Sequence, residues 1–114
     1  MPSTLETLYA RVDDSFARLR FERIAEKIAS DPSLLEIPLA NISRWVAQGH
    51  SAEARLENWR DRLLVARSSA TGLKSLLSLL RDPSAEAEEL RTFSPFAGIL
   101  SRIELDELRW TSQH

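Results

Sequence analysis

Apolar residues recur at intervals of three and four along most of this chain, and this spacing constrains its fold more than any other feature. Within residues 3–30, for example, the stripe runs through Leu5, Leu8, Tyr9, Val12, Phe16 and Leu19. One side of an α-helix has this period, whereas a half-buried strand alternates apolar and polar residues. No stretch of five residues alternates in that way with the Val, Ile and Thr that strands favour. We therefore predict an all-α fold, a compact bundle of five or six helices.

Two Asp-Pro pairs predict helix starts. In Asp31–Pro32 and Asp82–Pro83 the aspartate can accept a hydrogen bond from the first turn, and the proline occupies the first helical position. Pro38 lies inside the helix that the first pair would begin. Because proline lacks an N–H and disfavours a helical residue before it, we expect a kink or short break at Ile37.

Serine residues predict the remaining helix starts. Ser51 precedes an apolar stripe over residues 52–66, and residues 68–72 have the composition of a small polar loop before a leucine-rich helix. Ser101 and Glu104 have the spacing of a capping box. We expect them to open a last helix whose apolar stripe contains Ile103, Leu108 and Trp110.

The N-terminal segment differs because its apolar face rotates after Phe16. Ser3 and Glu6 have capping-box spacing, and the later stripe shifts to Phe21, Ile24 and Ile28. We expect either a break near residues 13–14 or a continuous helix that meets two different neighbours. We predict one domain over residues 1–114, with a helical extension at 1–20 and a core bundle at 21–110.

Composition excludes several classes of protein. Hydrophobic residues make up 43% of the 114 residues and charged residues 28%, which is an ordinary globular mixture rather than that of a disordered or collagen-like chain. No cysteine occurs, so thiol catalysis, disulfides and thiolate metal sites are excluded. No apolar run approaches the ~20 residues that span a bilayer, and the first residues lack the pattern of a signal peptide. We expect a cytoplasmic protein without a membrane association.

No residue pattern predicts a catalytic, metal or cofactor site. His50 and His114 have no second ligand at the three- or four-residue spacing of a helical metal site. No serine lies in a nucleophile elbow, and three scattered glycines cannot form a phosphate-binding loop. Glu104 and Glu107 share a helix face, but acids in a first turn also complement the helix dipole. We therefore predict a non-enzymatic protein with no cofactor, although a polar pocket around either glutamate would favour an enzyme.

Charge is distributed unevenly. Residues 41–81 carry seven basic and three acidic side chains, a net charge of +4, whereas residues 82–114 carry three basic and seven acidic side chains, a net charge of −4. Either these are solvated helix faces, or they form a dipolar surface that pairs with a partner or with a second copy.

A nucleic-acid-binding alternative rests on the helix expected over residues 52–67. The segment 40–63 reads as helix, glycine turn and helix, but a helix-turn-helix would need apolar residues where Arg44, His50 and Arg55 stand. A basic face remains as the candidate contact surface, made of Arg55, Arg60, Arg62 and Arg67. Acids at intrahelical ion-pair spacing partly balance it.

Residues 23–107 also resemble a group of uncharacterised small bacterial all-helical proteins. The blocks that carry the resemblance are IAEKIASDPSLLEI, ANISRW, RLENWRDRL, LLSLLRDPS and, most specifically, SPFAGIL at residues 94–100. Pro38 departs from the pattern, and residues 1–20 lie outside it. The resemblance implies a small partner protein encoded beside another short gene, in the style of a toxin–antitoxin module. It singles out Asn41, Arg44, Trp45, Arg91 and the segment 94–98.

The favoured hypothesis is therefore a protein–protein interaction module, an antitoxin-like partner in a two-gene bacterial system. We expect it to bind a protein partner, with a homo-oligomer as a further possibility. The candidate partner-binding residues are Tyr9, Val12, Phe16, Arg44, Phe96 and Trp110. The alternative is a nucleic-acid-binding or regulatory protein that uses the basic face of the helix expected over residues 52–67.

Overall fold

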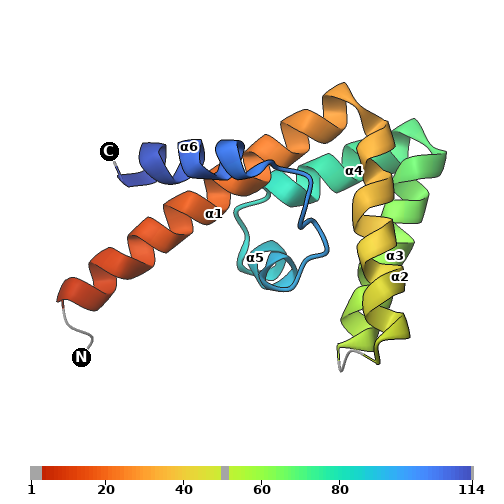
Figure 1. Cartoon of the computed structure of the whole chain (residues 1–114), viewed down its shortest axis with the longest axis horizontal. Helices are drawn as coiled ribbons and strands as arrows, with labels where there is room; N and C mark the ends of the chain where they lie inside the picture. The colour runs from red at the N-terminus through yellow and green to blue at the C-terminus, as the bar shows by residue number, and fades with distance from the viewer. Residues whose placement is uncertain (1–3, 50–51, 114) are drawn as a thin grey trace.

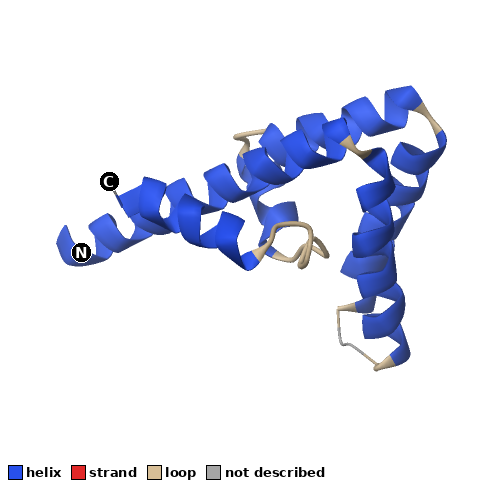
Figure 2. Cartoon of the chain, turned by 45° about the horizontal axis from the view of Figure 1, so that its top comes forward, coloured by secondary structure: helices blue, strands red, loops and turns tan. Residues whose placement is uncertain are grey.

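The computed structural model describes residues 4–49 and 52–113, with side chains described for residues 16–49 and 52–111. These residues form six α-helices and one 3-10 helix, with no strand among them, which confirms the predicted all-α bundle (Figures 1 and 2). The helices are α1 (Thr4–Ser30), η1 (Pro32–Leu35), α2 (Glu36–Ala47), α3 (Glu53–Ser68), α4 (Ala70–Arg81), α5 (Ala85–Thr92) and α6 (Arg102–Gln113).

Helix α1 is continuous for 27 residues, so there is no break near residues 13–14. Both α4 and α6 pack on it, in agreement with the expected continuous helix that meets two different neighbours (Figure 1). Among its described side chains, the first buried ones are Phe21, Ile24, Ala25 and Ile28. Phe16 is partly buried against that core.

The first Asp-Pro pair begins a helix, but of the 3-10 kind. The carboxylate of Asp31 accepts a hydrogen bond from the Ser33 N–H at 3.1 Å, and Pro32 follows as the first residue of η1. The expected break at Ile37 is wrong, because the irregularity lies upstream and α2 begins at Glu36. Pro38 therefore falls in the first turn of α2, where a backbone N–H would have no intrahelical acceptor, and its ring is buried.

Helices α3 and α4 are separated by a single residue, so the expected polar loop at 68–72 is wrong. Ser69 is the N-cap of α4, and its hydroxyl accepts a hydrogen bond from the Gly72 N–H at 2.9 Å. Gly72 allows the close approach of the two helices, because a Cβ there would lie 2.4 Å from the backbone oxygen of Val65. The expected cap at Ser51 lies outside the described residues.

The second Asp-Pro pair does not begin its helix. Asp82 accepts a hydrogen bond from the Ser84 N–H at 2.8 Å, and Ser84 then caps α5 by accepting from the Ala87 N–H at 3.2 Å. The start of α5 is thus displaced to Ala85. The pair forms a turn that leads from α4 into this short helix.

An aromatic cluster lies where the helices meet. Phe96, which is 4% exposed, makes edge-to-face contacts with Trp59 and Phe21 at ring-centroid distances of 5.3 and 6.4 Å. The indole N–H of Trp59 donates to the Phe93 carbonyl at 2.7 Å. The segment between α5 and α6 is therefore part of the core, and it sets where α6 begins.

Candidate functional site

The segment that leads into α6 is fixed by a buried asparagine of α2. The Asn41 amide donates to the carbonyls of Pro95 and Ala97 at 2.9 and 2.8 Å, and its own oxygen accepts from Arg44 at 2.7 Å. Gly98 follows with a φ of +96°, a conformation that other residues adopt at a cost. Helix α6 therefore leaves the core in a defined direction.

The capping box predicted at the start of α6 is confirmed. The Ser101 N–H donates to Glu104 at 3.0 Å, and the Glu104 N–H donates to the Ser101 hydroxyl at 3.1 Å. Lys27 of α1 also binds Glu104 at 2.9 Å and the Ile99 carbonyl at 2.7 Å. The hydrogen bond from the Ser101 backbone, followed by that from Lys27, lowers the pKa of Glu104. This carboxylate is held ionised, unlike a general acid, whose pKa would be raised.

Helix α6 packs on α1 through one of its sides. Leu108 is buried, Leu105 is half-buried, and the guanidinium of Arg109 lies 5.3 Å from the ring centre of Phe16. The packing side of α6 thus has one fully buried leucine and a cation–π contact at its far end.

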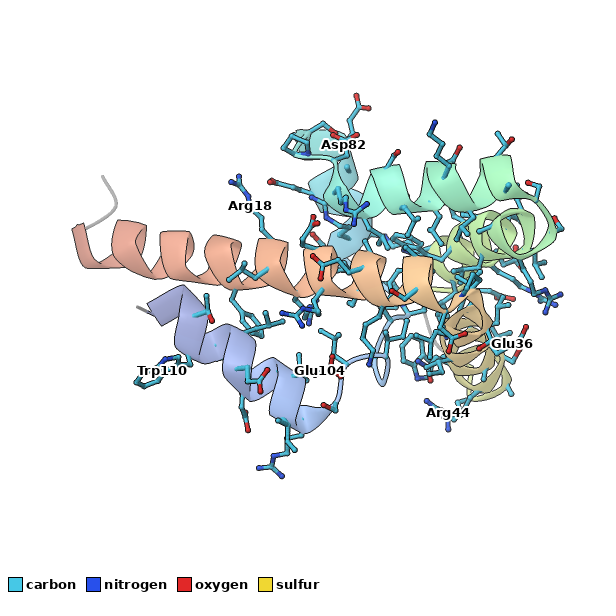
Figure 3. All side chains as sticks on the ribbon, turned by 90° about the horizontal axis from the view of Figure 1, so that it is seen from above. Arg18, Glu36, Arg44, Asp82, Glu104 and Trp110 are labelled. Carbon is cyan, nitrogen blue, oxygen red and sulfur yellow. The ribbon has the colours of Figure 1, made fainter. Side chains whose placement is uncertain are left out.

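The opposite side of α6 exposes two large apolar residues. Ile103 is 71% exposed and Trp110 is 65% exposed, although Trp110 also interacts within the chain. Seven residues are about two helical turns, so both lie on one face, with the exposed acids Asp106 and Glu107 between them. Figure 3 shows Trp110 on the side of α6 that points away from α1. We call Ile103, Asp106, Glu107 and Trp110 the outer face of α6.

Of the four candidate partner-binding residues whose side chains the structure describes, two lie on accessible surface. Trp110 belongs to the outer face of α6, and Arg44 is exposed on α2 (Figure 3). Phe16 is half-buried beneath Arg109, and Phe96 is a core residue whose side chain does not reach the outer surface. The side chains of Tyr9 and Val12 lie outside the described residues.

The four arginines of the nucleic-acid alternative do not lie on one face of α3. They are exposed, but they form pairs seven residues apart on either side of the buried stripe, with Arg55 and Arg62 on one side and Arg60 and Arg67 on the other. Arg67 binds Glu36 at 3.1 Å. The buried stripe that divides the pairs contains Leu56, Trp59, Leu63 and Ala66.

The other residues singled out by the resemblance have structural contacts. Arg91 is buried and donates to the Leu79 carbonyl at 2.7 Å near the end of α4. Trp45 is half-buried, with its ring 6.5 Å from that of Phe93. Pro95 is buried and supplies one of the carbonyls that Asn41 binds.

Sequence analysis missed two features. It placed Ile103 on the same stripe as Leu108, although five residues turn a helix by more than one full turn and put the two on different sides. It also gave no role to Arg20, a half-buried cation of α1. A signal was present, because no acidic residue stands three or four positions from Arg20 on either side.

Comparisons with protein-family models, curated proteins and solved structures found no match to this chain. In the part of the chain that the structure describes, no group of three His, Asp or Glu side chains is arranged to hold a metal ion. No helix among the described residues is both long and apolar enough to cross a membrane. His50 and His114 lie outside the described residues.

Proposed function

We propose that this chain is a protein–protein interaction module that binds a basic amphipathic helix of a partner on the outer face of α6. The observation that carries the proposal is the exposure of Ile103 and Trp110 on one helix face. Large apolar side chains gathered on an accessible surface are typical of interaction sites, and tryptophan contributes strongly to binding.

Charge supports the choice of partner. Asp106 and Glu107 stand between the two apolar residues, and neither carboxylate has an ion-pair partner among the described residues. A partner helix with apolar residues on one side and Lys or Arg beside them would cover both kinds of group. Opposite charges at the edge of such a contact accelerate association and select the partner.

The biological context of the proposal comes from elsewhere in the chain. The resemblance of residues 23–107 supports one further part of the proposal. It suggests that the partner is the product of a neighbouring short gene, as for an antitoxin. Of the outer face of α6, Ile103, Asp106 and Glu107 are among the last residues of that resemblance, and Trp110 lies beyond it. The outer face therefore supports an interaction module in general, and the two-gene system rests on the resemblance alone.

The proposal is tested with synthetic helical peptides and the full chain. A peptide of leucine and lysine in amphipathic order should bind, and its leucine–glutamate counterpart should not. Replacing both Ile103 and Trp110 by serine should weaken binding about a hundredfold or more, since each large apolar side chain contributes about 1.5 kcal/mol or more when buried. Titration calorimetry measures both affinities.

Two controls make the experiment decisive. Val65→Ser removes a 55% exposed apolar residue on α3 and should leave binding unchanged. Reversing both charges, Asp106→Lys with Glu107→Lys, should reverse the preference between the two peptides. Equal binding to the double serine variant contradicts the proposal. If analytical ultracentrifugation shows a dimer that the double serine variant does not form, the outer face of α6 binds a second copy of this chain and not a partner helix.

A further inference from the structure

A second candidate site is a small cavity where α1, the segment 94–100 and α6 meet. Its volume is about 230 Å³, and Ile24, Phe96, Leu100 and Leu105 supply apolar walls. The charged side chain in its lining is Arg20, and Ser94 adds a hydroxyl. The cavity therefore combines an apolar interior with one positive charge.

Arg20 has no anionic partner in the part of the chain that the structure describes. Its guanidinium lies over the ring of Phe21 at 4.9 Å, and its buried Nε makes no hydrogen bond. Burial lowers the pKa of this arginine because the charged form has lost part of its hydration. A partly desolvated cation with an unused donor is unfavourable unless an anion compensates it.

The hollow on the other side of Arg20 is a weaker candidate. It is larger, about 560 Å³, and other arginines line it as well. Two of its arginines already have carboxylate partners, however, because Arg18 lies 3.7 Å from Glu88 and Arg81 lies 3.1 Å from Glu22. In the smaller cavity no carboxylate lines the wall, and the Ser94 hydroxyl makes no hydrogen bond with the described residues.

We propose that the cavity beside Arg20 binds a small monocarboxylate with a compact apolar body. The carboxylate would accept hydrogen bonds from the Arg20 guanidinium and the Ser94 hydroxyl, while the apolar body contacts Ile24 and Leu105. A carboxylate matches the planar fork of arginine. A dianion such as phosphate would leave one charge uncompensated in an apolar site.

The size of the cavity limits the ligand further. Sites for drug-sized molecules usually enclose about 300–1,000 Å³, so 230 Å³ suits a molecule of roughly ten heavy atoms or fewer. Short aliphatic and simple aromatic carboxylates have this size. The site is separate from the outer face of α6, because Leu105 lies on the opposite side of that helix from Ile103.

Titrations of the full chain with butyrate and benzoate test the proposal. Amide signals around residues 94–100 should shift with either acid in NMR spectra, but not with butyramide, benzamide or inorganic phosphate. Arg20→Gln should weaken carboxylate binding about tenfold or more, because it removes a charge-assisted hydrogen bond. Arg23→Gln is the matched control, since Arg23 is exposed on the same helix and pairs with Glu26.

The thermal stability of the variants separates a ligand site from a packing role. Because the charge of Arg20 is unpaired, Arg20→Met should fold with a Tm at or above that of the wild-type chain, and benzoate should raise the Tm of the wild type alone. Binding of the amides as strong as that of the acids, or equal carboxylate binding by Arg20→Gln, would overturn the proposal. So would a marked fall in Tm for Arg20→Met, which would make the arginine a structural residue.

Discussion

The α3–α4 pair and the α1–α6 pair differ in how fully the chain covers its own apolar residues. In the first pair, Gly72 lets the backbones approach, and the contact continues into buried leucines on both helices. In the second, α6 buries Leu108 against α1 and leaves Ile103 and Trp110 exposed. The first pair leaves one large apolar residue exposed, Val65 at 55%, whereas the second leaves two on one face of α6, where another molecule can contact both.

Trp59→Ala, on the buried side of α3, should have the largest effect on stability. It would remove a side chain that is 2% exposed, together with its hydrogen bond to the Phe93 carbonyl. We expect a loss of about 3–5 kcal/mol in the free energy of unfolding, measured by urea denaturation. Trp59→Phe keeps an aromatic ring but removes the hydrogen bond to that carbonyl, so its free energy of unfolding should fall less than that of Trp59→Ala. Equal losses in both variants would show that the hydrogen bond, and not the volume, dominates.

Gly72→Ala tests the close approach of α3 and α4. Alanine is the better helix former by about 1 kcal/mol, but its Cβ would meet the Val65 backbone oxygen at 2.4 Å. Since backbone cannot move aside as a side chain can, we expect a net loss of about 1–3 kcal/mol. Ser75→Ala, at an exposed position of the same helix, should be neutral or slightly stabilising. A stabilised Gly72→Ala variant would mean that the two helices separate at little cost.

Glu104→Gln tests how α6 is anchored to α1. The pKa of Glu104 lies below its ordinary value of 4.5, so its contribution to stability is present above that pH and is lost as the pH falls through the lowered pKa. The variant should cost about 0.5–1 kcal/mol at pH 7, because glutamine keeps the capping hydrogen bond but loses the ion pair with Lys27. It should also lose less stability than the wild type between pH 6 and pH 3 in paired urea titrations. An unchanged pH dependence would mean that the contact with Lys27 does not stabilise the fold.

Ile103→Ser should have the smallest effect on stability. The side chain is 71% exposed, so its loss should change the free energy of unfolding by less than about 0.5 kcal/mol. Leu108→Ser on the buried side of the same helix is the matched comparison and should be clearly destabilising in thermal denaturation. A large loss for Ile103→Ser would show that this residue belongs to the core of the chain, and the outer face of α6 would then lose its main support.

The helices were predictable because their signals are local. The period of the apolar residues and the Ser101–Glu104 capping box depend on neighbours within four positions, and both predictions are confirmed. Predictions failed where two local signals competed. At Asp82–Pro83, for example, the aspartate binds the Ser84 N–H, and Ser84 is the residue that caps α5.

The candidate sites were less predictable because they depend on contacts between distant segments. Trp110 was predicted as a candidate partner-binding residue, but the orientation of Ile103 was not predicted, because it follows from which side of α6 meets α1. Spacing shows that Arg20 has no acid at ion-pair distance along its own helix, but it cannot reveal that the segment 94–100, some 75 residues away in sequence, also brings no carboxylate to it. The packing of Phe96 between Phe21 and Trp59 is likewise a tertiary result.

The hydrogen bonds from Asn41 to the carbonyls of Pro95 and Ala97 make the orientation of α6 depend on α2, a helix more than fifty residues earlier in the chain. A synthetic fragment of residues 101–113 would lack that tether, and a helix of this length is marginal in water by itself. Such a fragment should bind the partner helix more weakly than the intact chain does, because it would have to fold as it binds. The binding proposed for α6 is thus conditional on the folded state of α2 and of the segment that leads into α6.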